Sequence, residues 1–150
     1  MPVIGGPWAQ GTAAKLYLPV RSQQGASLTT GYAVALAIGG ASFQGNNAVL
    51  PASGTAGNLP GFIGVARADI ADTEYGLVLC WGFGASVRYS NVGTSLTINQ
   101  GDPLVPGSAA GGLFSLAPTY AASGFKFVLA SNVPAAISAP GYMSGLLRCL

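Results

Sequence analysis

The sequence predicts an all-β protein, a single-domain barrel or sandwich of about eight or nine short antiparallel strands. Two observations predict this class. Apolar segments of roughly four to eight residues, rich in β-branched and aromatic side chains, alternate with turns made of Gly, Pro, Asn and Asp. In addition, no stretch of the chain carries a sustained 3.6-residue apolar repeat with capping residues at its ends, as a helix would.

The length of 150 residues is that of one domain. Within it we expect an extended N-terminal arm over residues 1–14 and the β domain over residues 15–150. The arm is rich in Gly and Pro, which argues against a helix, yet it carries Val3, Ile4 and Trp8. Two readings stay open: the arm docks on another chain through these apolar side chains, or it folds back on its own domain.

Residues 15–20 alternate with a period of two residues, which indicates a strand. Leu16, Leu18 and Val20 share one face, and Lys15, Tyr17 and Pro19 share the other. We therefore expect a half-buried strand here. Its proline predicts a position at a sheet edge.

Residues 32–38 show the clearest alternation in the chain. One face carries the large side chains, and the other carries only Ala33, Ala35 and Ala37. An all-alanine face is neither a solvated surface nor a bulky core face. We expect it to lie flat against another sheet or another subunit.

The stretch 61–106 is the centre of the prediction. It contains a strand at 61–66, a polar turn, and a strand at 75–82 that is apolar on both faces. A strand without a polar face is typically central and covered on both sides. Further strands are expected at residues 48–50, 86–89, 96–99, 113–117, 125–130 and 142–150.

A candidate interface follows from these patterns. It combines the apolar residues of the arm, the alanine face and the apolar C-terminal segment. Its members are Val3, Ile4, Trp8, Ala33, Ala35, Ala37, Tyr142, Leu147 and Leu150.

Charged side chains are scarce: Lys and Arg number six, Asp and Glu four, and His is absent. They make up 7% of the chain against about 25% in an ordinary soluble protein, while 50% of the residues are hydrophobic. Disorder goes with the opposite composition. The longest apolar run, residues 32–38, is far shorter than the roughly 20 residues of a membrane helix, and residues 1–14 lack the pattern of a signal peptide. We favour a subunit of a larger assembly, covered by its neighbours.

Catalytic and metal-binding chemistry has little support. Without His the chain lacks the commonest general base, the usual nucleophile pairs and most zinc sites. Asp69, Asp72 and Glu74 offer a weak calcium or paired-carboxylate pattern without the spacing of a calcium loop, and are interpreted as a solvated turn. We assign no catalytic, cofactor-binding or metal residue and expect no cofactor. A small hydrolase using Asp69 or Glu74 is kept as one alternative.

The remaining polar and sulfur-bearing residues suggest little chemistry. The basic residues are scattered singly, so we expect no direct contact with nucleic acid. Asp102 lies in a predicted turn and is expected to hydrogen-bond the backbone that follows it. Cys80 and Cys149 are interpreted as small buried hydrophobic residues, and a bridge between them stays open.

Four segments in the middle of the chain combine turns with glycine-bounded strands: Gly61-Phe62-Ile63-Gly64-Val65-Ala66, Glu74-Tyr75-Gly76-Leu77-Val78, Trp81-Gly82 and Ile98-Asn99-Gln100-Gly101-Asp102-Pro103-Leu104. This succession, over roughly residues 31–117, resembles the decoration or cement proteins of tailed bacteriophage heads. The resemblance implies a β-barrel-like or β-tulip-like fold. It also implies binding to the outer surface of the assembled shell, where such proteins, often trimers, staple neighbouring capsomers together.

The partners implied are the major capsid protein and copies of this chain, with no membrane partner. The location implied is the capsid surface of the virion, and the host cytoplasm during assembly. With so few charges, we expect contacts made by apolar burial and backbone hydrogen bonds, with the arm adding a strand to a neighbour. Two alternatives remain: another phage component of the minor shell, neck or tail, and a barrel that binds a sugar or a small apolar ligand.

Overall fold

The structure is a computed structural model that describes residues 14–37, 45–51, 61–89, 98–106, 114–116, 128–132 and 141–148. These residues form nine strands, and no helix occurs among them, so the all-β prediction is confirmed. The strands are β1 (Leu16–Ser22), β2 (Ala33–Leu36), β3 (Asn47–Val49), β4 (Phe62–Ala66), β5 (Tyr75–Tyr89), β6 (Pro103–Pro106), β7 (Phe114–Leu116), β8 (Val128–Asn132) and β9 (Gly141–Arg148).

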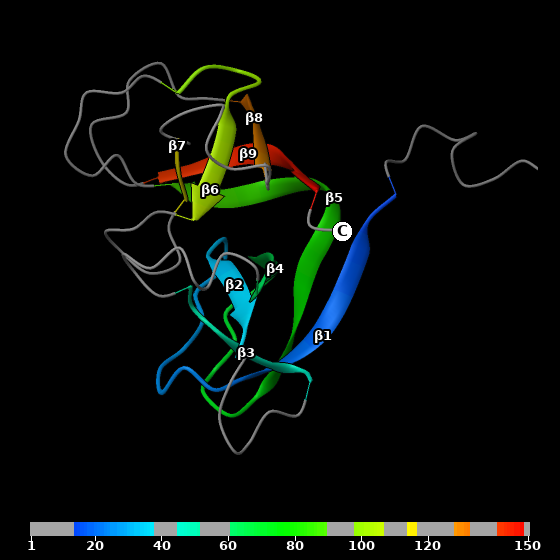
Figure 1. The fold of residues 1–150 in the computed structure, drawn as a ribbon, viewed down its shortest axis with the longest axis vertical. Coiled ribbons are helices and arrows are strands. Elements are labelled where there is room, and N and C mark those ends of the chain that lie inside the picture. The colour runs from blue at the N-terminus through cyan, green and yellow to red at the C-terminus, as the bar shows by residue number, and fades with distance from the viewer. Residues whose placement is uncertain are drawn as a thin grey trace, which may run out of the picture.

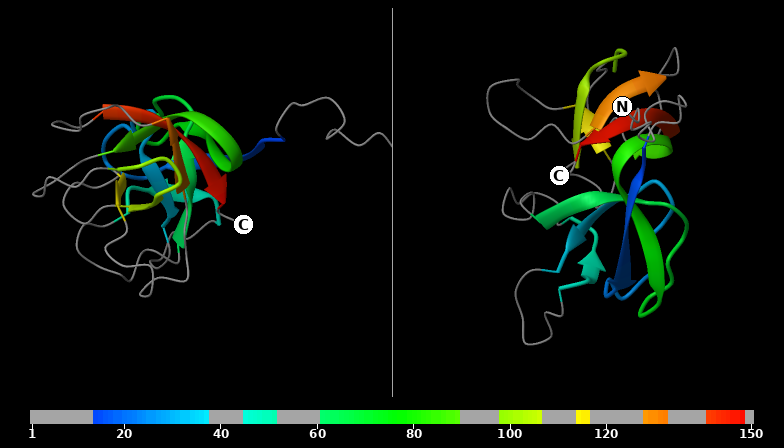
Figure 2. Two further views of the ribbon diagram at one scale, coloured as in Figure 1. Left: turned by 90° about the horizontal axis from the view of Figure 1, so that it is seen from above. Right: turned by 90° about the vertical axis from the view of Figure 1, so that its right-hand side faces the viewer.

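The strands form two closed rings that share β5. The first ring runs β1-β3-β2-β4-β5 and is closed by the pairing of β1 with β5. The second runs β5-β7-β6-β8-β9 and is closed by the pairing of β5 with β9. Figure 1 shows β1 to β4 gathered at one end and β6 to β9 at the other, with β5 running through both. Figure 2 shows the same division from the side.

The strand β5 is longer and less regular than the sequence predicted. It spans 15 residues and unites the separate strands expected at 75–82 and 86–89. A positive φ of 108° at Gly82 and a register shift between Gly84 and Val87 let the strand bend while it stays paired. Each half of β5 therefore serves a different ring.

Not all of the pairings are antiparallel, contrary to the prediction. The β1–β3 and β5–β7 pairs are parallel. The strand predicted at 96–99 is also wrong in its described part, because Ile98 and Asn99 lie outside any strand. The strand that follows, β6, begins instead at Pro103, directly after the turn predicted at Asp102.

The first ring has an interior filled by its own side chains. Each of its five strands contributes a buried residue to one cluster: Val20, Ala48, Val34, Ala66 and Val78. Full burial of a valine stabilises the folded state by roughly 1.5–3 kcal/mol. This cluster therefore gives the first ring a core of its own.

A second cluster joins the two rings. Ala33 and Val65 come from the first ring, Leu104 and Met143 come from the second, and Leu79 comes from the shared strand. Leu79 and its neighbour on β5, Val78, thus face different clusters. The expectation of a central strand covered on both sides holds for this middle part of β5.

Three residues of the candidate interface lie inside the chain's own core. Ala33 and Leu147 have no exposed surface, and Ala35 is 1% exposed. Ala33 belongs to the joining cluster, so the alanine face is covered there by side chains of the same chain. These three residues are therefore not available for contact with another chain, whereas Ala37 is only half-buried.

The apolar face predicted for β1 is buried only at Val20, which has no exposed surface. Leu16 and Leu18 are exposed, and Tyr17 packs against the joining cluster instead. The reason is the register with β5, which places Tyr17 beside the buried Leu79 after a bulge between Leu16 and Tyr17. The bulge is not visible in the alternation of the sequence.

Candidate interaction surface

Exposed apolar side chains lie on both faces of the sheet where β1 pairs with the first half of β5. These side chains are Leu16 and Leu18 of β1 and Tyr75 and Leu77 of β5, which we call the β1–β5 strip. Tyr75 is 65% exposed, and Leu16 and Leu77 are each 49% exposed. Monomeric proteins expose single apolar side chains commonly, but an apolar group gathered on one strand pair indicates a binding surface.

The register of the two strands explains the grouping. Residues paired across an antiparallel ladder lie side by side on one face. Pro19 is paired with Leu77, and Arg21 with Tyr75, so the aromatic ring, the leucine and the proline share one face. Leu16 and Leu18 alternate with Pro19 and face the other way. The first part of β1 is therefore exposed and apolar on both faces.

One backbone edge of β1 is also open. In the part of the chain that the structure describes, β1 is paired with β5 from Leu16 to Arg21, whereas β3 joins it only at Arg21 and Ser22. An edge strand with unpaired backbone groups is a place where another chain can add a strand. The proline expected to mark an edge, Pro19, lies in this open part.

Arg88 forms a joint between the rings on the second half of β5. Its Nη1 atom donates a hydrogen bond to the hydroxyl of Tyr32, 3.2 Å away. Its Cζ atom lies 5.0 Å from the ring centroid of Tyr32 and 5.6 Å from that of Tyr142. Tyr142, a predicted interface residue, is half exposed, so one side of its ring is held by Arg88 while the remainder is open to solvent.

The carboxylates hold turns together. Asp69 accepts hydrogen bonds from the backbone N–H of Thr30 at 2.7 Å and from its hydroxyl at 2.8 Å. These two bonds, the backbone one first, hold the pKa of Asp69 below its ordinary value. Asp72 accepts a hydrogen bond from the backbone N–H of Gly25 at 2.9 Å. The predicted solvated turn is therefore tied to the loop between β1 and β2.

Asp102 contacts the backbone on the side opposite to the one expected. Its Oδ2 atom accepts a hydrogen bond from the N–H of Asn99 at 2.6 Å, so it binds the backbone that precedes it. Among the described residues, no group of acidic, Cys or His side chains has the arrangement of a metal site.

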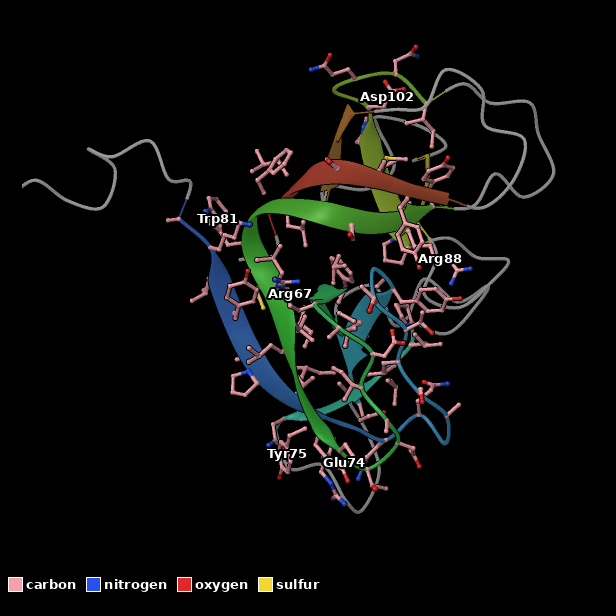
Figure 3. The ribbon with its side chains drawn as sticks, turned by 180° about the vertical axis from the view of Figure 1, so that it is seen from behind. Arg67, Glu74, Tyr75, Trp81, Arg88 and Asp102 are labelled. Atoms are coloured by element: carbon pink, nitrogen blue, oxygen red, sulfur yellow. The ribbon has the colours of Figure 1, made fainter. Side chains whose placement is uncertain are left out.

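Two basic residues share a pocket beside the strip. The pocket has a volume of about 120 Å³ and lies between the start of β1, the end of β4 and the middle of β5. Figure 3 shows Arg67 beside β5, with Glu74 and Asp102 toward opposite ends of the molecule. The lining residues are Lys15, Tyr17, Val65, Ala66, Arg67, Leu79, Gly84 and Ser86.

Several predicted residues are not part of this surface. Val3, Ile4, Trp8, Leu150 and Cys149 lie outside the described residues. Cys80 is a free, buried thiol whose pKa is raised by its burial.

None of the strip's four residues was among the predicted interface residues, and the predicted Tyr142 is exposed but lies on β9, outside the strip. The exposure of Tyr75 and Leu77 on β5 could not be predicted from the sequence. An apolar strand has the same sequence pattern whether its face is covered by the same chain or exposed to solvent.

Protein-family models and curated proteins give no match to this chain. None of the described segments is a helix with the length and hydropathy needed to span a membrane.

Proposed function

We propose that this chain is a structural subunit of a larger assembly, and specifically a decoration protein on the head of a tailed bacteriophage. The observation that supports an assembly role is the β1–β5 strip, a strand pair that exposes apolar side chains on both faces, in a chain with 7% charged residues. The phage head is proposed from the sequence resemblance over roughly residues 31–117.

The proposed mechanism is non-covalent stapling. A neighbouring chain covers the strip and gains roughly 25 cal/mol for each Å² of apolar surface removed from water. Several copies linked in one oligomer each contribute a contact, and linked contacts raise the overall affinity by orders of magnitude. Apolar contacts are little affected by salt, so the protein should stay bound at high ionic strength.

The described interior argues against the alternative of a ligand-binding barrel. Such a barrel needs an open apolar cavity, but Val20, Val34 and Val78 fill the first ring and have no exposed surface. The carboxylates of the hydrolase alternative, Asp69 and Glu74, are exposed, and Asp69 is engaged by Thr30.

The experiment measures binding of the purified chain to expanded phage heads stripped of their decoration. The double variant Leu16→Gln with Leu77→Gln should weaken binding at least tenfold, because it removes one exposed apolar side chain from each face of the strip. Phe83→Gln is the matched control, since Phe83 is an exposed apolar residue of the same strand outside the strip. Binding to necks or tails in place of heads, or release of the wild-type chain by salt, would contradict the proposal.

A further inference from the structure

The pocket beside the β1–β5 strip is lined by residues with hydrogen-bond donors, and no described carboxylate is among them. Lys15 and Arg67 bring an ammonium and a guanidinium, and Tyr17 and Ser86 bring hydroxyl groups. The pocket's lining is therefore suited to a ligand that supplies the acceptors.

The two cations have no partner in the described part of the chain. Neither Lys15 nor Arg67 makes an ion pair with any described residue. Asp69 is engaged by Thr30, Asp72 by Gly25, and Asp102 by Asn99. Figure 3 shows Glu74 at the start of β5, below the Arg67 side chain. Two of the chain's six basic residues thus line one pocket, and no described carboxylate lines it with them.

The size and lining of the pocket limit the kinds of ligand that can bind. A volume of about 120 Å³ corresponds to roughly four water molecules, which is enough for a short side chain. Val65 and Leu79 supply an apolar wall. A guanidinium binds a carboxylate with two parallel hydrogen bonds, and an ammonium adds a second charge. A carboxylate on a short aliphatic stem fits both the wall and the donors.

We propose that this pocket binds the carboxylate of an acidic side chain from the partner protein that covers the strip. The proposal rests on the proposed assembly function. Tyr17 and Leu79, which line the pocket, are paired across the ladder next to the pair of Pro19 and Leu77 on the same face, so a chain lying over Leu77 passes beside the pocket. The strip supplies apolar contact, and the pocket selects which partner segment is placed there, because electrostatic complementarity chiefly gives specificity.

A titration followed by ¹⁵N NMR tests the pocket without any partner. The probes are glutamate and glutamine, each capped by an N-acetyl group and an N-methylamide, which have nearly the same shape and differ in charge. The capped glutamate should shift the amide signals of Tyr17, Arg67 and Ser86 with saturation in the millimolar range. The capped glutamine should not, and Arg67→Gln should abolish the shifts.

Three outcomes would contradict the proposal that the pocket binds a carboxylate. These are equal shifts with both probes, no shift at tens of millimolar glutamate, or stronger saturation of the same signals by inorganic phosphate. The last outcome would place the preference with phosphate rather than with a carboxylate.

A second measurement separates this proposal from the proposed function. In the binding assay with phage heads at low salt, Lys15→Gln with Arg67→Gln should weaken binding about two- to tenfold and remove its residual salt dependence. Arg21→Gln is the control, because it removes a charge of β1 outside the pocket. If the wild-type chain binds heads and the double variant binds equally well, the proposed carboxylate site is wrong, but the proposed function stands. If capped glutamate binds but the wild-type chain does not bind heads, the proposed function fails instead.

Discussion

Arg88 shows how a charged residue is used where charges are few. Its guanidinium lies against two tyrosine rings and donates one hydrogen bond, while its buried Nε atom has no partner among the described residues. Cation–π contacts of this kind stabilise by roughly 0.5–2 kcal/mol. The backbone N–H of Arg88 also donates to the carbonyl of Gly31, at 2.9 Å. One residue of β5 thus ties the loop before β2 to β9.

Gly64 is a position where only glycine fits. Its φ is 153°, and a Cβ atom there would collide with the carbonyl oxygen of Leu79 on the neighbouring strand. Gly64→Ala should therefore lower the free energy of unfolding by about 3 kcal/mol or more, or prevent folding, since both backbone strain and a clash add up. Denaturant titration followed by circular dichroism measures this change.

Gly25→Asn is the matched control for that substitution. Gly25 has a φ of 74°, which asparagine tolerates, and nothing lies within 4 Å of a Cβ built there. It should change stability by less than about 1 kcal/mol. Equal effects of the two variants would show that the approach of β4 to β5 at Gly64 is not a close one.

At the scale of elements, the loop between β1 and β2 and the turn between β4 and β5 behave as one unit. Leu28 and Ile70 form a β-bridge between them, with hydrogen bonds of 2.9 Å in both directions. Asp69 and Asp72 add their bonds to Thr30 and Gly25 on either side. Both Leu28 and Ile70 belong to the core of the first ring, so this unit closes one end of it.

The depressed pKa of Asp69 predicts a pH dependence for this unit. Because the folded state favours the carboxylate, the stabilisation is fully present above the unfolded pKa, near 3.8, and is lost as pH falls through the lower folded pKa. The wild-type chain should therefore lose stability below about pH 4, and Asp69→Asn should remove part of this loss. Thr30→Val keeps the backbone hydrogen bond, which is the larger cause of the lowered pKa, so this variant should keep most of the pH dependence. Denaturant titrations from pH 6 to pH 2.5 check this, and an unchanged slope in Asp69→Asn contradicts it.

The strands illustrate what the sequence predicts well. Local alternation located β1, β2, β4, β7 and β9 close to their observed positions, because period two depends only on neighbouring residues. It did not predict that β5 continues through Gly82 and Gly84, since glycines between apolar segments also mark turns. Nor did it predict which apolar faces are bare. Exposure of Leu77 and burial of Leu79 depend on which strands lie across them, which is information from distant parts of the chain.

At the scale of the whole molecule, the two rings share strand β5, and they could unfold either separately or together. Each ring is closed by its own pairing with β5. The first ring has a core of its own, but the joining cluster takes residues from β2 and β4 as well as from β6 and β9. Opening the second ring would expose that cluster and leave Ala33 and Val65 uncovered. We therefore expect the two rings to unfold together.

Leu147→Ala tests this cooperativity. Leu147 is fully buried, lies in the joining cluster and is paired with Gly82 of β5, so its truncation should cost about 2–5 kcal/mol. Leu28→Ala is the matched variant, because Leu28 is equally buried but lies in the core of the first ring. If the rings form one unit, each variant should speed hydrogen exchange by the same factor at Ala66 in the first ring and at Met143 in the second, under conditions where exchange reports global unfolding. Loss of protection at Met143 alone in Leu147→Ala would instead mean that the second ring opens by itself. The first ring, which includes β5 and bears the β1–β5 strip, would then be the more stable part of the molecule.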